Sequence, residues 1–160
     1  MTVRTLILLR HAKAADPDDY ATDIERPLTA RGHRDATAAG EWLAEQGLVP
    51  DAVLCSTAVR TRETLSDVSL KSDTSVIFDP RIYAGPALDT LDLVQSVGAT
   101  VETLLLVGHN PTISDLSDEL APRALDNNGL ATAGIAVHRF DGTWKDLTAA
   151  ELIQQHTARG

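Results

Sequence analysis

The sequence predicts an α/β fold in three layers: a mostly parallel, doubly wound sheet with helices on both faces. Short apolar runs alternate along the chain with segments whose apolar residues recur at helical spacing. Parallel strands need long crossovers, usually helices, so this alternation indicates a parallel sheet between helical layers. A length of 160 residues suits one domain, and we expect residues 1–160 to form a single unit.

Five apolar runs are the expected strands. Residues 3–9 (VRTLILL) and 101–108 (VETLLLVG) are continuous, as expected for strands covered on both faces. Residues 51–56 (DAVLCS) and 74–79 (TSVIFD) are shorter runs of the same kind. Residues 132–140 (TAGIAVHRF) have a looser pattern, which suits a strand at an edge of the sheet.

Helical patterns lie between these runs. The segment 29–47 has Thr29 as a candidate N-cap, small and apolar residues on one face, and Gly47 as a stop signal. Residues 56–68 open with serine and threonine as cap candidates, and residues 87–98 alternate acids with leucine and valine at helical spacing. These three segments supply the crossovers that parallel strands require.

The acidic segment 14–27 (AADPDDYATDIERP) follows neither a strand nor a helix period. We expect it to be a long surface loop between the first strand and the first helix. The chain has no internal repeat and no linker of biased composition.

The net charge of −9 argues against nucleic acid and anionic membranes as partners. The charge is uneven, because residues 1–62 hold 8 basic and 9 acidic groups, whereas residues 63–160 hold 6 and 14. The N-terminal part can therefore hold a local positive site within an acidic protein.

The cysteine count and the lengths of the apolar runs indicate the cellular compartment in which the protein is expected. A single cysteine, Cys55, excludes an internal disulfide framework and fits a reducing environment. The apolar run before Arg10 is too short for a signal-peptide core, and no stretch is long enough to span a bilayer. We therefore expect a cytoplasmic protein.

Cationic and imidazole side chains follow three of the expected strands. Arg10 and His11 come directly after the first strand, and His109 follows the strand at 101–108. Arg60 lies in the first turns of the helix after residues 51–56. Ligands of doubly wound sheets bind beyond the carboxyl ends of strands, so these side chains are expected to converge at one rim.

The segment after the strand at 101–108 strengthens this prediction. Gly108 permits a sharp turn, Asn110 is a candidate N-cap, and Pro111 suits the first position of a helix. The first N–H groups of that helix, residues 110–120, would point back at the rim. Arginine offers a planar fork of donors that matches phosphate oxygens, so the pattern indicates an anion site, above all for a phosphoryl group.

Each feature has an ordinary explanation when taken alone. An Arg-His pair after a strand is common, Arg60 could be a solvated helix residue, and the segment after residue 107 could be turn chemistry. Their equivalent positions in the predicted topology favour a common site. We interpret the remaining histidines, His33, His138 and His156, as structural or surface residues.

The motifs resemble those of the histidine phosphatase superfamily, and within it the short SixA-type phosphohistidine phosphatases. The resemblance rests on RHAK at 10–13, RPLTxRG at 26–32 and VGHNP at 107–111, together with CSTAVRTRET at 55–64, in order and spacing over nearly the whole chain. Like that branch, the chain has Ala12 where the wider superfamily has glycine. The resemblance implies a phosphoglycerate-mutase-like fold.

The resemblance also implies roles for the four rim residues. His11 would be the nucleophile that becomes phosphorylated, and Arg10, Arg60 and His109 would complete the phosphate pocket. The chemistry agrees, because a neutral imidazole attacks phosphorus well and fixed guanidinium groups stabilise charge on the transferring oxygens. His109 could donate a hydrogen bond or, if protonated, supply a charge. No carboxylate-rich metal motif accompanies these residues, so we expect no metal and no cofactor.

Two departures from the wider superfamily bear on the substrate. The asparagine that often follows the Arg-His-Gly motif is missing, which argues against a sugar-phosphate mutase. No residue stands out as the general acid that many members carry after the third strand. The candidate acids are Asp16, Asp18, Asp19, Asp23, Glu25 and Asp79.

We therefore expect a phosphatase that acts through a phosphohistidine intermediate, on phosphohistidine of a partner protein. A protonated imidazole leaves as a neutral molecule, so a P–N bond needs less acid catalysis than an alkyl ester. A small-metabolite phosphomonoesterase and a non-catalytic module that senses phosphate remain alternatives. A cysteine-dependent phosphatase fits poorly, because only four residues separate Cys55 from Arg60 and none is glycine.

Overall fold

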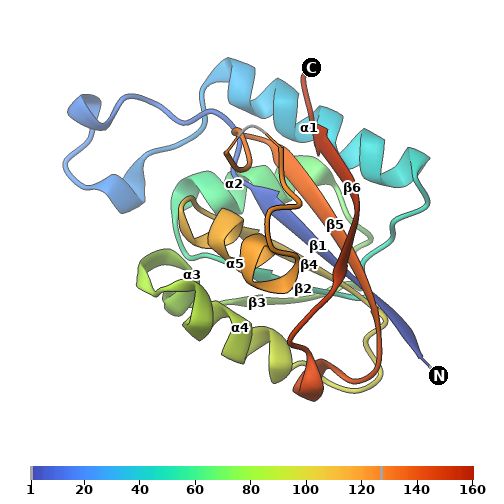
Figure 1. Cartoon of the computed structure of the whole chain (residues 1–160). Helices are drawn as coiled ribbons and strands as arrows, with labels where there is room; N and C mark the ends of the chain where they lie inside the picture. The colour runs from blue at the N-terminus through green and yellow to red at the C-terminus, as the bar shows by residue number, and fades with distance from the viewer. Residues whose placement is uncertain (1, 127) are drawn as a thin grey trace.

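The computed structural model of the protein describes residues 2–126 and 128–160. Its central element is a six-stranded sheet in the order β3-β2-β4-β1-β5-β6 (Figure 1). The strands are β1 (Val3–Arg10), β2 (Ala52–Cys55), β3 (Ser75–Phe78), β4 (Thr103–Gly108), β5 (Gly134–Asp141) and β6 (Glu151–Thr157).

The sheet is mostly parallel, as predicted. β3, β2, β4 and β1 run in the same direction, whereas β5 pairs antiparallel with β1 and β6 antiparallel with β5. The prediction that residues 132–140 form an edge strand was wrong, because β6 covers that side of β5. The first residues of β5 are buried, while β6 is half-exposed and rich in polar residues. Because of this polar composition, β6 was not predicted from the sequence.

Helices cover both faces of the sheet, which confirms the three-layer prediction (Figure 1). One layer holds α1 and α2, and the other holds α3, α4 and α5. Their bounds are α1 (Ala30–Glu45), α2 (Val59–Val68), α3 (Pro80–Ala84), α4 (Ala87–Gln95) and α5 (Thr112–Leu120).

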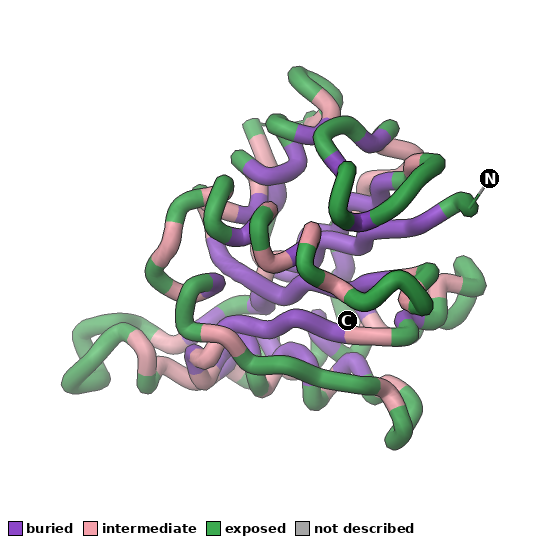
Figure 2. Tube along the Cα trace, turned by 90° about the horizontal axis from the view of Figure 1, so that it is seen from below, coloured by how far each residue is buried: buried purple, intermediate pink, exposed green. Residues whose placement is uncertain are grey.

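The core consists of two apolar clusters, one on each side of the sheet. Alternate residues of β1 serve the two sides: Ile7 and Leu9 pack with α1 and α2, whereas Leu6 and Leu8 pack with α4 and α5. All four side chains are fully buried, and Figure 2 shows the buried strands at the centre of the molecule. β1 is therefore fixed on both faces and along both edges.

Some predicted helix ends are confirmed and others are wrong. Thr29 caps α1 by accepting a hydrogen bond from the N–H of Gly32, and Gly47 follows the helix with a φ of 69°. Serine and threonine do not cap α2, whose N-cap is Ala58. Asn110 does not cap α5 either, since the helix begins at Thr112 and its N-cap is Pro111.

The side chain of Asn110 serves the neighbouring loop instead of the helix. Its amide donates to the carbonyl of Leu130 at 2.7 Å, and its oxygen accepts from the hydroxyl of Ser114 at 2.6 Å. The helix α3 was not predicted from the sequence. It is a single short turn that Asp79 caps by accepting from the N–H of Arg81.

The acidic segment is a surface loop, as expected, and we call residues 15–27 the acidic arm. It projects beyond the body of the molecule at the left of Figure 1 and contains two short 3₁₀ turns, Pro17–Asp19 and Asp23–Glu25. Its two ends are held together, because the N–H of Ala15 donates to the carbonyl of Pro27 at 2.8 Å. Among the residues that the structure describes, no helix is long and apolar enough to cross a membrane.

Candidate active site

The carboxyl ends of β1, β2 and β4 bring the four predicted residues to one rim. Arg10 pairs in register with Gly108, so His11 and His109 leave neighbouring strands at the same level. Their rings are tilted against each other, with centroids 5.3 Å apart. Arg60 reaches the same place from the first turn of α2 and lies close enough to lower the pKa of both rings.

The segment after β1 is packed tightly against the start of α1. The N–H of Thr29 donates to the carbonyl of Lys13 at 2.9 Å. A Cβ on Gly32 would lie 2.2 Å from the same carbonyl oxygen, so only glycine fits there. The close approach explains why the RPLTxRG motif has glycine at position 32, and it holds the segment that follows His11 against the start of α1.

His11 is buried, with one ring nitrogen tied to the backbone. Its Nδ1 lies 2.7 Å from the carbonyl oxygen of Ala12. A carbonyl only accepts, so Nδ1 carries the hydrogen and Nε2 keeps the lone pair. Burial is the main cause that lowers the pKa of His11 to about 4. The hydrogen bond to Ala12 opposes this effect, and the charges of Arg60 and Arg10 add to it. The ring is therefore neutral at pH 7, with Nε2 available as a nucleophile.

His109 is also buried and neutral. Its Nε2 lies 2.7 Å from the hydroxyl of Ser56, and its Nδ1 has no hydrogen-bond partner among the residues that the structure describes. Burial, followed by the charge of Arg60, lowers its pKa to about 3. Of the two roles left open by the sequence, this favours a hydrogen-bond donor over a cation.

The two arginines are held by contacts that leave part of each guanidinium unused. Arg10 donates from one terminal nitrogen to the carbonyl of Leu130 at 3.1 Å. Arg60 donates from both terminal nitrogens to Asp23, at 2.8 Å to its carbonyl and 2.9 Å to its carboxylate. Burial, and then the charge of Arg60, lowers the pKa of Arg10. Two cations this close together favour an anion between them.

The unpaired buried polar atoms are concentrated at this rim. Among the described residues, four buried side-chain nitrogen or oxygen atoms have no hydrogen-bond partner, and three of them are Arg10 Nε, Arg60 Nε and His109 Nδ1. A buried polar group without a partner costs about 1–3 kcal/mol, so three at one place indicate a ligand that accepts hydrogen bonds. An oxyanion with several oxygens meets that requirement.

Comparison with known proteins agrees with this geometry. Residues 6–83 match the sequence profile of the histidine phosphatase superfamily, branch 1. An uncharacterized protein of Mycobacterium tuberculosis is 40% identical over 94% of this chain and 100% of its own length. The chain belongs to the histidine phosphatase superfamily. It is a hydrolase of that superfamily with the phosphoglycerate-mutase-like fold.

Two solved structures place it near the SixA-type members of the superfamily. A candidate phosphohistidine phosphatase SixA from Nakamurella multipartitia is 36% identical, with a TM-score of 0.89 over 99% of this chain and 98% of its own. A protein histidine phosphatase SixA complexed with tungstate is 25% identical, with a TM-score of 0.83 over 96% of both chains.

Of the six acids considered as the superfamily's general acid, Asp23 reaches the site residues. Its carboxylate accepts from Arg26 at 2.8 Å, from Arg60 at 2.9 Å and from the hydroxyl of Tyr83 at 2.8 Å. These hydrogen bonds, that of Arg26 first, hold the pKa of Asp23 far below its usual range. The group is ionised at pH 7 and has no proton to give in this arrangement.

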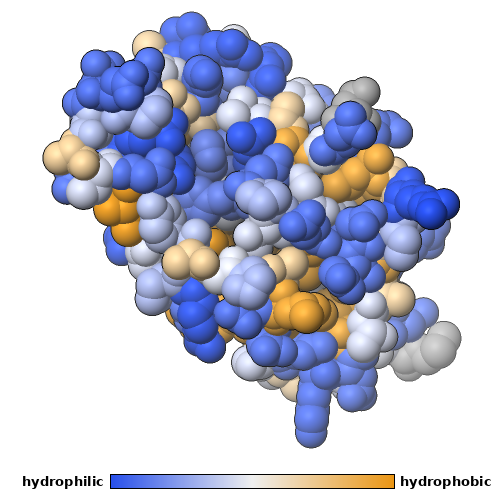
Figure 3. Space-filling view, turned by 60° about the vertical axis from the view of Figure 1, so that its left-hand side comes forward, coloured by the Kyte–Doolittle hydropathy of each residue, from blue (hydrophilic) through white to orange (hydrophobic). Residues whose placement is uncertain are grey.

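The other candidate acids serve local structure or lie exposed. Asp79 caps α3 and pairs with Arg81 at 2.8 Å. Asp16 accepts from the N–H of Asp18 at the first turn of the acidic arm. Asp18, Asp19 and Glu25 are exposed on the arm. The surface beside the projecting arm is largely hydrophilic (Figure 3).

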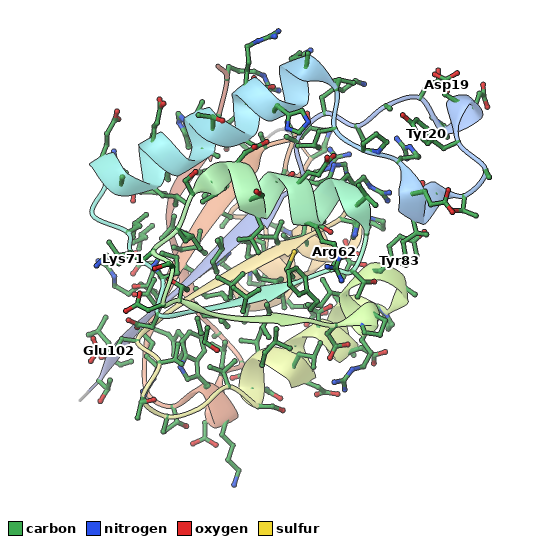
Figure 4. The ribbon with its side chains drawn as sticks, turned by 180° about the vertical axis from the view of Figure 1, so that it is seen from behind. Asp19, Tyr20, Arg62, Lys71, Tyr83 and Glu102 are labelled. Carbon is green, nitrogen blue, oxygen red and sulfur yellow. The ribbon has the colours of Figure 1, made fainter. Side chains whose placement is uncertain are left out.

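Tyr83 is a site residue that sequence reasoning missed. In Figure 4 it rises from α3 toward the acidic arm, whose outer end carries Asp19 and Tyr20. Its ring meets that of His109 edge to face, with centroids 5.4 Å apart, and the guanidinium carbon of Arg60 lies 5.9 Å from its centroid. No local pattern marks this tyrosine, since its hydroxyl partner is 60 residues away in the sequence.

Cys55 does not take part in this site as a nucleophile. The thiol is buried at the end of β2, and burial raises its pKa to about 12. A protonated, buried thiol argues against a cysteine-dependent phosphatase. In the part of the chain that the structure describes, no group of three or more histidine, cysteine or carboxylate side chains could hold a metal ion.

The three remaining histidines have structural partners away from the rim. His33 lies 2.6 Å from Asp67 at the surface. His138 is buried in β5, with Ser117 and the carbonyl of Ala150 at its two ring nitrogens. His156 in β6 stacks on Trp42, with ring centroids 4.5 Å apart.

Replacing Asp23 with asparagine is expected to reduce kcat/KM by less than about tenfold. Loss of a working general acid would cost about 10²–10⁴-fold, whereas an exposed ion pair contributes about 0–1 kcal/mol. The measurement is kcat/KM of both proteins on a phosphorylated protein and on an aryl phosphate. Asp19→Asn, on the same arm, is the matched control. A loss of 10²-fold or more in Asp23→Asn alone would identify Asp23 as the acid.

Proposed function

We propose that the protein is a phosphohistidine phosphatase that removes the phosphoryl group from a histidine on a partner protein through a covalent intermediate on His11. The observation that carries this proposal is the set of three buried, unpaired nitrogens of Arg10, Arg60 and His109 beside a neutral imidazole. A phosphoryl group offers three oxygens to such donors and a phosphorus atom to the nucleophile.

The proposed reaction has two steps. In the first, the lone pair on Nε2 of His11 attacks phosphorus while the bond to the partner's ring nitrogen breaks, and the protonated partner imidazole leaves as a neutral ring. In the second, water attacks the phosphoryl group on Nε2, which releases inorganic phosphate and restores neutral His11. Splitting one displacement into two is the usual advantage of a covalent intermediate.

The arginines and His109 would stabilise the transferring group without a metal. The Nε–H groups of Arg10 and Arg60 and the Nδ1–H of His109 would donate to the three equatorial oxygens. Fixed donors in a buried site gain more from such charge than donors in water, because they need no reorganisation during the reaction.

The proton balance favours a phosphohistidine substrate over an alkyl ester. An alkyl ester expels an alkoxide, which needs a positioned acid. Asp23 reaches the site, and hydrogen bonds from Arg26, Tyr83 and Arg60 keep it ionised. The likeness to SixA structures supports the same class, and tungstate, bound by one of them, is a tetrahedral oxyanion like phosphate.

The two alternatives predict different properties. A module that only senses phosphate would need the arginines, but it would not need a ring with an oriented lone pair, which His11 has. A small-metabolite phosphomonoesterase could use the same four residues and would differ in its substrate.

We further propose that residues 1–160 act as one domain, in the cytoplasm and in signalling, without nucleic acid or membrane as partners.

A substrate panel tests the proposal. We expect kcat/KM to be highest on a phosphohistidine protein, intermediate on an activated aryl phosphate and lowest on alkyl phosphates, all under one set of conditions. This order follows from how little acid catalysis each leaving group needs. Efficient hydrolysis of an alkyl phosphate together with an untouched phosphohistidine protein would favour the metabolite phosphatase. An inert protein that still binds phosphate would favour the sensing module.

A further inference from the structure

We propose that Ser56 is a positioning residue that keeps the ring hydrogen of His109 on Nδ1, so that this nitrogen faces the phosphoryl group as a donor. This inference rests on the proposed function, because it assigns the partner of that donor. Ser56 follows β2, is fully buried and belongs to none of the roles assigned above.

The backbone around Ser56 is held firmly. Its N–H donates to the carbonyl of Val107 on β4 at 3.1 Å. Its own carbonyl accepts from the hydroxyl of Thr61 at 2.9 Å. The Ser56 side chain therefore starts from a fixed position between the two strands that lead to Arg60 and His109.

The hydrogen bonds of the Ser56 hydroxyl determine which way its own hydrogen points. The oxygen accepts from the N–H of Ala58 at 3.3 Å and lies 2.7 Å from Nε2 of His109. A hydroxyl has one hydrogen, and the available acceptor for it is the lone pair on Nε2. Since the ring is neutral at pH 7, an accepting Nε2 leaves the ring hydrogen on Nδ1, the buried nitrogen without a partner.

Without Ser56, the ring of His109 would tend to carry its hydrogen on Nε2 instead of Nδ1. After burial, the charges of Arg60 and Arg10 help to lower the pKa of His109. In the proposed geometry these cations face Nδ1, and cations favour a lone pair over a hydrogen on the nitrogen that faces them. A lone pair on Nδ1 would repel phosphoryl oxygens. The hydroxyl of Ser56 opposes this tendency from the far side of the ring.

In this arrangement His11 and His109 both carry their ring hydrogen on Nδ1, but they present different nitrogens to the phosphoryl group. His11 gives Nδ1–H to the carbonyl of Ala12 and presents the lone pair of Nε2. His109 takes a hydrogen bond at Nε2 from Ser56 and presents Nδ1–H. A carbonyl that only accepts and a hydroxyl that donates thus sort two chemically identical rings into a nucleophile and a donor.

The test is the ¹⁵N spectrum of the histidine rings in the full-length protein, since protonated and unprotonated ring nitrogens differ in chemical shift. His109 is assigned from the signal missing in His109→Asn. We expect Nδ1–H in the wild type, with a change at this nitrogen on titration with inorganic phosphate. Ser56→Ala should move the ring toward Nε2–H and lower kcat on an aryl phosphate by about tenfold, the equivalent of one lost hydrogen bond.

Two further variants separate positioning from structure. Ser56→Thr keeps a hydroxyl and should restore Nδ1–H and most of kcat. Ser117→Ala removes a buried hydroxyl that contacts the ring of His138 and not that of His109, and should leave the His109 signals unchanged. A wild-type ring protonated on Nε2, or a Ser56→Ala ring that keeps Nδ1–H, overturns the proposal whether or not any substrate is hydrolysed. A correct tautomer in a protein that hydrolyses nothing supports the assignment for Ser56 and contradicts only the proposed function.

Discussion

His11→Ala is expected to abolish turnover and the covalent phosphoryl label together. The hydrogen bond between Nδ1 of His11 and Ala12 leaves the lone pair of this ring on Nε2, whereas the tautomer proposed for His109 presents Nδ1–H to the same site. Brief reaction of the wild type with substrate, followed by denaturation, should leave an acid-labile phosphate on His11. Mass spectrometry of the digested protein locates the label, and steady-state kinetics measure the loss.

Two control variants make this result specific. His109→Ala should slow turnover but still allow labelling of His11, because it removes a donor and leaves the nucleophile. His33→Ala, which alters a surface contact with Asp67, should behave like the wild type. Label that persists in His11→Ala, or that maps to another residue in the wild type, would refute the assignment of the nucleophile.

Arg60→Ala is expected to lose about 2–4 kcal/mol of transition-state stabilisation, or about 30- to 10³-fold in kcat/KM, as for one preorganised donor. Arg60 is 6% exposed, its two terminal nitrogens donate to Asp23, and its Nε has no hydrogen-bond partner among the described residues. Arg60→Lys should restore only part of the rate, since an ammonium group cannot donate in two directions from one plane. Because the proposed site takes its positive field from Arg10 and Arg60, EDTA should leave the wild-type rate unchanged.

Arg62 provides the matched control for this experiment. It lies two residues further along α2, donates to the carbonyl of Thr57 and stacks on Phe78 with its guanidinium carbon 4.2 Å from the ring centroid (Figure 4). Arg62→Ala removes the same charge from the same helix and should keep near-normal kcat/KM. Equal losses of kcat/KM in the two variants would mean that the effect of Arg60→Ala comes from the lost net charge and not from a contact with the phosphoryl group. A rate that falls on chelation and returns with divalent ions would contradict the metal-free site.

The fold was largely predictable because its signals are local. The buried parallel strands are continuous apolar runs, and such runs can be recognised in the sequence without knowledge of the tertiary structure. The rim was predictable because parallel strands end at one edge, so that Arg10, His11 and His109 needed only the topology to be brought together. The roles of these residues came from the resemblance, and they remain predictions.

The features that could not be predicted depend on distant partners. β6 alternates polar and apolar residues weakly, and it forms because β5 offers an edge to pair with. Asn110 fits an N-cap by type, but the Leu130 carbonyl competes for its side chain. Asp23 is one of several acids on the acidic arm, and only the folded chain brings it to Tyr83. The Ser56 hydroxyl meets its imidazole across 53 positions of sequence.

The alternation of core residues along β1 has a consequence for how this chain can diverge. Ile7 and Leu9 belong to one side of the sheet and Leu6 and Leu8 to the other, and the strand is paired with β4 and β5 along both edges. Inserting or deleting one residue within β1 would turn the apolar side chains on one side of the change toward the wrong layer. Insertions in the loops carry no such penalty, whereas the number of residues between Leu6 and His11 is tied to the packing of the core.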